Sequence, residues 1–254
     1  KATAECGSAT SDAVEVYMNA PTRILGNPVP VSITYGENAQ FAIQAEGTGS
    51  LEYQWQESKG DFWADYIVEG VGAASQPQTE LQISKPTAAN SGNKYKCVVR
   101  GLCGSVSTDE AVLVIQKAPL TIIAEDKTKV YGEENPTLTY RFEGFVQGED
   151  TDNSGLIGAP KLTTKVDTVT GVGENIISID TGDLASANYS FNFVNGKITV
   201  EKALLTITAN DKSKTYGDVN PVFDLSYSGF VRGDKIDRND LVGQPVLTSD
   251  GKDS

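Results

Sequence analysis

The chain has 254 residues, of which 39% are hydrophobic and 22% charged, so it has enough apolar material for folded cores and room for two or three small domains. Its net charge of −13 would repel a phosphate backbone, which argues against nucleic acid as a partner. It contains no histidine, the commonest general base and zinc ligand, and no run of about 18 apolar residues that would insert into a membrane.

The segment 1–21 matches a later part of the same chain. CGSATSDAVEVYMNAP at 6–21 resembles CGSVSTDEAVLVIQKAP at 103–119, with one residue inserted. We therefore expect residues 1–21 to be the last strand of a β domain of the kind that follows, with the rest of that domain before Lys1.

Residues 22–117 carry the pattern of a sandwich domain. The alternating run AQFAIQAEG precedes Trp55 in LEYQWQ, and LQISKPTAANSGNKYKCVV places Tyr95 two residues before Cys97. This order resembles an immunoglobulin-like domain, with its strand B, the tryptophan of strand C, strand E and a tyrosine corner on strand F. Ile43 occupies the strand B cysteine position, so the usual inter-sheet disulfide cannot form and we expect Ile43 to pack against Trp55.

The cysteines then have a second pairing open to them. Cys97 is free to pair with Cys103 in CVVRGLCG across five intervening residues, a bridge that would contribute about 2 kcal/mol. We expect this bridge because a secreted chain oxidises thiols that lie close together, and two reduced thiols are the alternative. We interpret the odd third cysteine, Cys6, as one whose partner precedes Lys1 rather than as a reactive thiol.

The segment GDFWADY contains the candidate ligand contacts. Trp63 lies there beside Phe62 and Tyr66, in an expected loop between strands C and C′. Exposed aromatic side chains at this place could stack on a sugar or contact another protein. The alternative is a C′ strand that packs its aromatic residues on an edge of the sandwich.

An internal repeat fills the rest of the chain. Residues 118–169 align without a gap on residues 203–254 at an offset of 85, so that APLTIIAEDKTKVYGEENP recurs as ALLTITANDKSKTYGDVNP and EGFVQGED as SGFVRGDK. The period-2 alternation of Leu120, Ile122 and Ala124 predicts a half-buried strand. In both copies the Tyr-Gly pair predicts a tight bend or bulge.

The end of the first repeat has the pattern of a β-hairpin. YSFNFV and KITVE flank Asn195-Gly196, the favoured pair for a type I′ turn, which would place Phe193 opposite Ile198 on one face. We define the repeats as residues 118–202 and 203–254. The second lacks a counterpart of residues 170–202, so we expect the native polypeptide to continue beyond Ser254.

The repeats resemble a known family of modules. Their LTI-A-DK-K-YG-NP opening and GFV-GD block are similar to the YGx-type MBG repeats of large bacterial surface proteins, which are accompanied by immunoglobulin-like domains of the present kind. The resemblance implies an all-β fold of tandem antiparallel β-sandwich modules. It also implies the cell-surface setting of Bacteroidota-type adhesins, which some lineages export by the type IX secretion system. It brings no catalytic residues.

Signatures of enzyme chemistry are missing from the sequence. It has no phosphate-binding glycine loop, no Gly-x-Ser-x-Gly elbow and no zinc spacing among its cysteines. Calcium is the more credible ligand, since GEDTDNSG supplies Asp150 and Asp152 and DTGD supplies Asp180 and Asp183. Asp and Asn also favour turns for conformational reasons alone, so solvated turns are the alternative.

These features predict a non-catalytic segment of a bacterial surface protein. We expect an extracellular stalk or adhesin that spaces or presents binding domains, with the neighbouring domains of the same polypeptide as its partners and no cofactor. The alternative is an adhesion module that binds host or environmental glycans or proteins through loops of the immunoglobulin-like domain.

Overall fold

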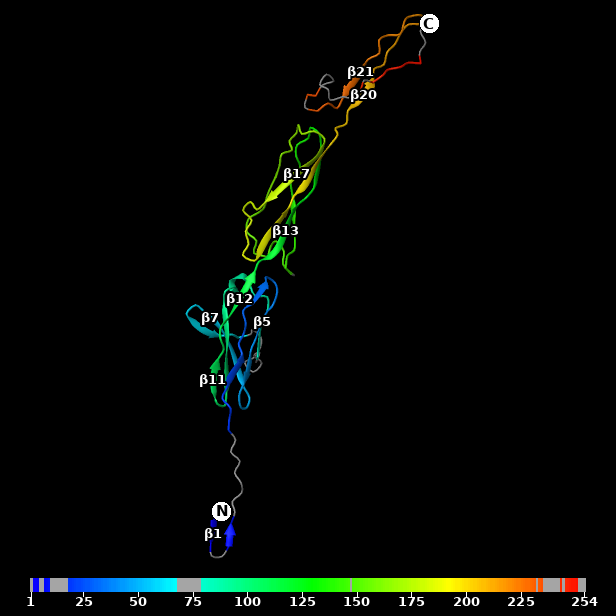
Figure 1. Ribbon diagram of the computed structural model, residues 1–254. Helices are drawn as coiled ribbons and strands as arrows, with labels where there is room; N and C mark the ends of the chain where they lie inside the picture. The colour runs from blue at the N-terminus through cyan, green and yellow to red at the C-terminus, as the bar shows by residue number, and fades with distance from the viewer. Residues whose placement is uncertain are drawn as a thin grey trace. The chain divides into compact units, whose positions relative to one another are not determined.

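The computed structural model describes residues 2–4, 7–9, 18–67, 79–146, 148–231, 233, 234, 243 and 245–250. Over these residues the fold is all-β, with a short 3-10 helix, η2 (Ala88–Asn90), and no helix long and apolar enough to cross a bilayer. The chain divides into two compact units (Figure 1). The first comprises residues 1–118, 146–149 and 187–190, and the second comprises residues 119–145, 150–186 and 191–254.

The N-terminal segment holds a two-stranded ribbon. Strands β1 (Ala2–Ala4) and β2 (Gly7–Ala9) pair antiparallel. Cys6 and residues 10–17 lie outside the described residues, and with them most of the strand expected in residues 1–21 and the predicted pairing of Cys6.

The immunoglobulin-like segment forms a sandwich. One sheet has the strand order β4-β12-β10-β7-β8, with β11 also paired to β10, and the facing strands form the pairs β3–β6 and β5–β9. All of these pairs are antiparallel except β4–β12, which is parallel. The strands are β3 (Arg23–Gly26), β4 (Val31–Thr34), β5 (Ala39–Ala42), β6 (Gln44–Glu46), β7 (Glu52–Lys59), β8 (Phe62–Asp65), β9 (Glu80–Ile83), β10 (Lys94–Gly101), β11 (Gly104–Ser107) and β12 (Ala111–Gln116).

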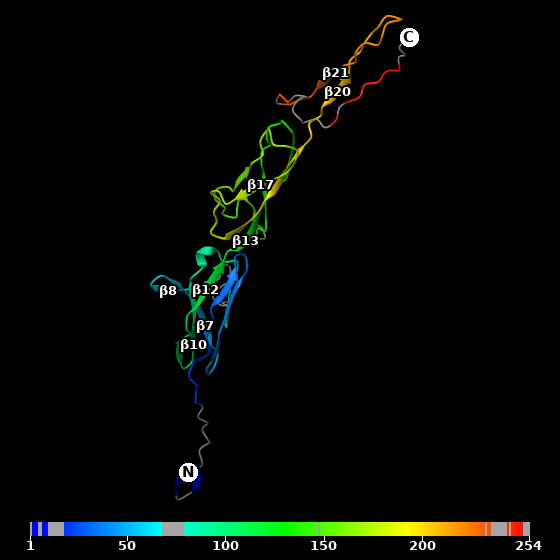
Figure 2. The same cartoon turned by 45° about the horizontal axis from the view of Figure 1, so that its top comes forward.

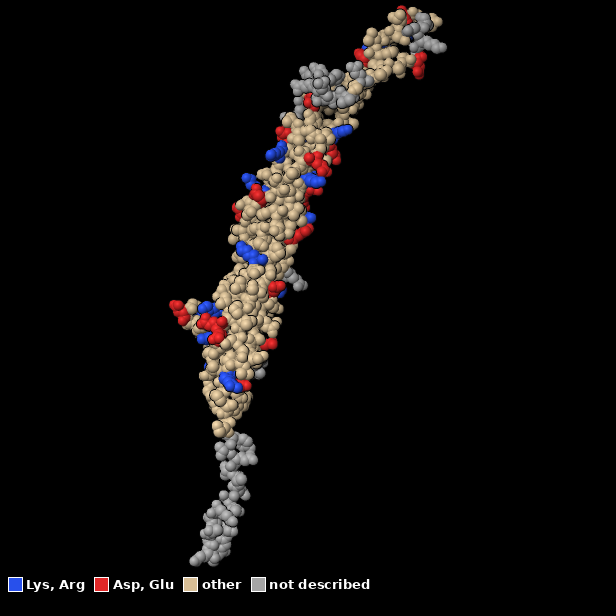
Figure 3. All heavy atoms as spheres, in the orientation of Figure 1, with Lys and Arg blue, Asp and Glu red and all other residues tan. Residues whose placement is uncertain are grey.

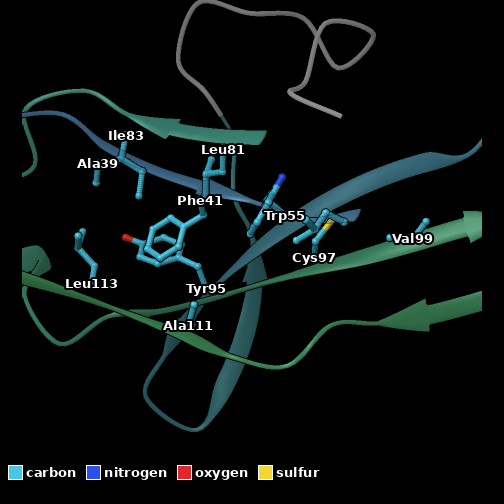
Figure 4. Packing of buried hydrophobic residues seen from close by; sticks show 11 residues of the cluster. Ala39, Phe41, Trp55, Leu81, Ile83, Tyr95, Cys97, Val99, Ala111 and Leu113 are labelled. Carbon is cyan, nitrogen blue, oxygen red and sulfur yellow. The ribbon is translucent and has the colours of Figure 1, made fainter. Parts of the chain in front are cut away.

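Aromatic side chains from both sheets meet in the core of this sandwich (Figure 4). The Phe41 ring lies 5.1 Å from that of Tyr95 and 6.3 Å from that of Trp55, centroid to centroid. Ile43 belongs to the same buried cluster as Trp55, as expected for the residue that replaces the strand B cysteine. Every second residue of β5 and β9 is buried in this core, as are Tyr95, Cys97 and Val99 of β10, as the alternation of the sequence indicates.

The first repeat is a second sandwich. Its sheets have the strand orders β15-β13-β18 and β14-β19-β17-β16, and they enclose a cluster that includes Ile122, Ile177, Ile198 and Val200. As predicted, burial alternates along β13. Leu120, Ile122 and Ala124 are buried, and the odd-numbered residues of the strand are half-buried or exposed. The strands are β13 (Ala118–Ala124), β14 (Lys127–Val130), β15 (Tyr140–Glu143), β16 (Lys161–Thr164), β17 (Gly173–Asp180), β18 (Tyr189–Val194) and β19 (Gly196–Glu201).

The predicted hairpin at Asn195-Gly196 is wrong. Strands β18 and β19 follow each other with one residue between them, but they belong to different sheets, so the chain crosses the sandwich here. Neither residue has the positive φ that a type I′ turn requires. Gly196 instead packs so closely that a Cβ would lie 2.6 Å from the Ala124 carbonyl oxygen. Phe193 and Ile198 do face one core, but from opposite sheets.

The second repeat preserves one strand pair of the first. Strands β20 (Thr206–Ala209) and β21 (Leu225–Ser228) pair with the register of β13 and β15, each partner shifted by 85 residues: Ile122↔Phe142 recurs as Ile207↔Tyr227. Ile207 is 43% exposed whereas Ile122 is fully buried. In Figures 1 and 2, β20 and β21 form a two-stranded ribbon.

Together the two units confirm the predicted fold class. The described residues form all-β, tandem sandwich modules whose strand pairs are mainly antiparallel. Each sandwich adds one parallel pair that the sequence did not predict, β4–β12 in the first and β14–β19 in the second.

Candidate functional site

The segment expected to be a ligand-binding loop is strand β8. It forms a hairpin with β7 in which Trp63 lies opposite Ser58 and Phe62 opposite Lys59. The hairpin projects from the body of the first unit in both views (Figures 1 and 2). Side chains alternate along the strand, so Trp63 points to the opposite face from Phe62.

The three candidate aromatic residues therefore do not form one platform. Tyr66 packs edge-on against the buried Tyr95, with 5.9 Å between ring centroids, and belongs to the margin of the core. On the outer face, the Lys96 ammonium lies 4.2 Å from the Trp63 ring centroid, the geometry of a cation–π contact. Phe62 is 64% exposed near the tip of the hairpin. What remains accessible is a partly covered Trp63 and, on the other face, Phe62.

The Cys97–Cys103 bridge is not formed, and both thiols are free. Cys97 is buried in the core, while Cys103 is exposed at the turn between β10 and β11. The four residues from Cys97 to the end of β10 at Gly101 span about 13 Å. A disulfide requires Cα atoms within about 7 Å, so the extended strand keeps these sulfur atoms apart. Burial also raises the pKa of the Cys97 thiol to about 12.

Three of the four acidic candidates for calcium, Asp150, Asp180 and Asp183, accept hydrogen bonds from backbone N–H groups. Asp150 Oδ1 accepts hydrogen bonds from the backbone N–H groups of Asp152 and Asn153, at 2.9 and 3.2 Å. Asp180 Oδ1 accepts one from Gly182, and Asp183 Oδ1 accepts one from Ala159, both at 3.0 Å. Within the described residues no three acidic, cysteine or histidine side chains are grouped as ligands for a metal ion.

A buried carboxylate lies in the core of the first sandwich. Glu57 is 6% exposed and accepts hydrogen bonds from the Tyr95 hydroxyl at 2.8 Å and the Asn93 amide at 2.7 Å. Burial by itself raises the pKa of Glu57, but the bonds from Lys59, Tyr95 and Asn93 outweigh it and the net pKa is lowered. Burial, reinforced by Glu57, raises the pKa of Tyr95. The tyrosine predicted as a corner thus holds a carboxylate from the neighbouring strand.

Residues that recur in the two repeats serve the fold of the repeat. The buried Lys129 ammonium donates to Asn135 Oδ1 at 3.1 Å and to the Asp167 carbonyl at 2.7 Å. The Asn135 amide donates to the Val166 carbonyl at 2.6 Å. These bonds fasten the turn before Pro136 to the segment after β16. The Lys and Asn of the repeated opening are therefore structural residues, which the sequence alone did not reveal.

The described residues leave a groove beside β13 and β15 that is lined in part by Glu125, Asp126 and Arg141, and its two carboxylates come from neighbouring residues of the link between β13 and β14. A groove beside β5 and β6 is lined by nine residues, of which Glu80 alone is ionisable. Paired-carboxylate hydrolysis needs two such groups across a cleft. On the face drawn in Figure 3, acidic and basic side chains are interspersed along the molecule.

One family model matches segments of both repeats. Residues 120–199 and 205–250 match the family model described as MBG domain (YGX type). These two segments resemble the MBG domain, and they are called MBG repeats below. The matched ranges contain Lys129 and Asn135 of the first repeat and both strands, β20 and β21, that pair in the second. No curated protein matches the chain.

Among the solved structures that match the chain are fragments of titin and of Dscam1. The I-band fragment I67–I69 from titin is 12% identical with a TM-score of 0.39, covering 72% of this chain and 66% of that fragment. The N-terminal four Ig domains of Dscam1 isoform 6.9 are 13% identical with a TM-score of 0.39, covering 74% and 47%. Titin M4 is 18% identical with a TM-score of 0.33, covering 39% and 100%.

Proposed function

We propose that this chain is a non-catalytic, extracellular stalk or adhesin segment of a large bacterial surface protein, which spaces or presents binding domains. The observation that carries the proposal is how the repeated residues are used. Lys129 and Asn135 recur as Lys214 and Asn220 at the offset of 85, and in the first repeat their side chains bind backbone and each other rather than line a cleft. A sequence repeated for its fold suits a spacer.

The setting follows from the same modules. MBG and immunoglobulin-like repeats are typical of extracellular or surface proteins, and the net charge of −13 favours solubility outside the cell. The resemblance to Bacteroidota-type surface proteins suggests export by the type IX secretion system. The partners are then the neighbouring domains of the same polypeptide.

Spacing can be tested by changing the number of repeats. The chain would be displayed between a membrane anchor and a terminal epitope, with and without an added copy of residues 118–202. The epitope of the longer chain should be reached by larger antibody-coated beads. Equal accessibility of the two chains would refute the spacer role.

The projecting hairpin favours a second candidate, adhesion through the immunoglobulin-like domain. Phe62 at 64% exposure lies in β8 and Ile67 at 71% exposure follows its end, and both are large apolar groups. Such groups can contact a host or environmental glycan or protein. A glycan array and a protein-binding screen would use the intact chain, Trp63→Ala and Phe62→Ala. Binding lost in either variant while Trp55 emission is unchanged supports adhesion, and no binding by the intact chain supports the spacer alone.

A further inference from the structure

Three Tyr-Gly turns recur in the chain, one in each module. They are Tyr35-Gly36, Tyr131-Gly132 and Tyr216-Gly217, and each glycine has a φ between 92° and 94°. In each, the acidic residue that follows donates its backbone N–H to the residue before the tyrosine: Glu37 to Thr34, Glu133 to Val130 and Asp218 to Thr215, at 3.0 to 3.1 Å. The immunoglobulin-like domain and the MBG repeats thus share one turn.

The first two turns occupy the same place in their sandwiches. Each follows a strand, β4 or β14, that pairs in parallel with the last strand of its module, β12 or β19. The backbone N–H of Tyr35 donates to the Gln116 carbonyl at 2.8 Å, and that of Tyr131 donates to the Glu201 carbonyl at 2.9 Å. The turn is therefore fixed to the end of the last strand in both modules.

In both turns a valine at an equivalent position of the repeat faces the glycine. A Cβ on Gly36 would lie 2.5 Å from Val146, and a Cβ on Gly132 would lie 2.7 Å from Val231. Val146 and Val231 are equivalent positions of the Gly-Phe-Val-x-Gly motifs of the two MBG repeats. Both members of the first contact belong to the first unit, and both members of the second belong to the second unit.

The loop that carries the valine is also the same in both copies. The backbone N–H of Glu149 donates to the Val146 carbonyl at 2.9 Å, and that of Asp234 donates to the Val231 carbonyl at 3.0 Å. Glycine is required in this turn for two reasons. Its φ is positive, and any side chain would collide with the valine. Two independent copies of one fit make an accidental contact a poor explanation.

A polar contact accompanies the apolar one in the first copy. The Tyr35 hydroxyl donates to Glu149 Oε1, and the Tyr189 hydroxyl donates to Glu149 Oε2. The backbone N–H of Val146 in turn donates to the Tyr189 hydroxyl oxygen at 2.9 Å. The two tyrosine rings meet edge-on with 5.6 Å between centroids. The acidic residue of the loop is thus held by the tyrosine of the turn.

The third turn has the same glycine φ and the same backbone bond, and among the described residues it is open. Tyr216 is 94% exposed, and no described atom lies within 4 Å of the position of a Cβ on Gly217. Its backbone bond from Asp218 to Thr215 matches the bonds of the two turns that contact a valine loop.

We propose that the Tyr-Gly turn is a recognition site for the Gly-Phe-Val-x-Gly loop of an MBG repeat, filled at Tyr35-Gly36 and Tyr131-Gly132 and open at Tyr216-Gly217. The occupant of the open turn is the corresponding loop of another MBG repeat, because the chain shows that loop on the other two turns. This site is independent of whether the chain acts as a stalk.

The filled turns can be tested by hydrogen–deuterium exchange of the intact chain. Val146→Asp should speed exchange of residues 34–37 about tenfold, because it places a charge against Gly36, while β17 and β19 stay protected. Val169→Asp, at an exposed valine of the same repeat, is the control and should leave exchange of residues 34–37 unchanged. Unchanged exchange of residues 34–37 in Val146→Asp would overturn the proposal.

Two further variants separate recognition from unfolding. Tyr35→Phe changes the turn instead of the loop. It removes the hydrogen bond from the Tyr35 hydroxyl to Glu149 and should speed exchange of residues 144–149. If Val146→Asp unfolds the first repeat, this variant decides the outcome in its place. Val231→Asp should act in the same way on residues 130–133, and a response in one copy only would reduce the site to a local contact and overturn it.

The open turn has its own test. A synthetic peptide of residues 141–152, which carries the loop, would be added to the intact chain at millimolar concentration. Slower exchange of residues 215–218 supports the assignment if the same peptide with V146D has no effect. No protection, or equal protection by both peptides, would overturn it for this turn.

Discussion

The hydrogen bond from Tyr95 to Glu57 gives a sharp prediction for the stability of the first sandwich. Tyr95 is fully buried, and its hydroxyl donates to Glu57 Oε1 at 2.8 Å. Tyr95→Phe removes one oxygen atom and leaves the ring contacts with Phe41 and Tyr66 in place. The change therefore removes the hydrogen bond to the buried carboxylate, together with the contact of the hydroxyl with the Asn93 side chain.

The expected cost follows from the partners that remain. A hydrogen bond to a charged group contributes about 1.5–3 kcal/mol. Glu57 keeps the Asn93 amide and the Lys59 ammonium as donors, so the carboxylate is not left unpaired. We expect a loss of about 2 kcal/mol in the free energy of unfolding, which lowers the urea midpoint by roughly 0.7–2 M at the usual slopes.

Tryptophan fluorescence reports this unit selectively. The two tryptophans of the chain, Trp55 and Trp63, both lie in the first unit. Urea titrations followed by their emission therefore do not report unfolding of the MBG repeats. Glu57→Gln and the double variant complete a cycle, whose coupling energy should be about 1 kcal/mol or more. A change below about 0.5 kcal/mol in Tyr95→Phe, or no coupling to Glu57, would refute the reasoning.

Three further outcomes are expected. The pKa of Glu57 is lowered in the folded state, so Glu57 stabilises the fold above the unfolded pKa of about 4.3, and this stabilisation is lost as the pH falls through the folded pKa. Glu57→Gln should therefore reduce the fall in the free energy of unfolding at acid pH, measured by urea titration, and an unchanged fall would contradict the assignment. Ile122→Ala should destabilise the first repeat by about 2–5 kcal/mol, while the equivalent Ile207→Ala at 43% exposure costs less than about 1 kcal/mol, both measured by hydrogen exchange; similar losses would count against the burial difference. A maleimide should modify Cys103 at once and Cys97 only after denaturation, and prompt labelling of Cys97 found by peptide mapping would show that its burial is wrong.

Local patterns predicted the strands of this chain well. The alternation of Leu120, Ile122 and Ala124 placed all three in the core of β13, and the Tyr-Gly pairs are turns with positive φ. Patterns of this kind are read correctly because burial on one face of a strand imposes period 2 whatever the strand pairs with.

Pairing between strands was the part that local patterns missed. Asn195-Gly196 has the composition of a hairpin turn. Whether β18 pairs with β19 or the two strands enter opposite sheets depends on β17 and on the more distant β13 and β14. The prediction of the Cys97–Cys103 bridge was wrong for a related reason. Residues that are close in sequence lie far apart along an extended strand.

One feature of the site was present in the sequence and overlooked. The third Tyr-Gly pair, TYGE at 34–37, lies in the immunoglobulin-like segment and matches VYGE and TYGD in the repeats. It does not follow the 85-residue period of the repeats, since its distance to the next copy is 96 residues. The contact between each glycine and its valine is visible only in the structure, because nothing in the sequence relates Gly36 to Val146.

The two parallel strand pairs have a mechanical consequence. In β4–β12 and β14–β19, a strand near the start of the module lies beside the strand that ends it, with four residue pairs in register in each. Tension applied to the chain ends pulls such strands in opposite directions along their axes, which loads every hydrogen bond of the pair in shear at once rather than opening them one after another. Single-molecule pulling should therefore show a force peak for each of these sandwiches, and Val31→Pro, which removes a donor from β4, should lower the first peak and leave the second unchanged.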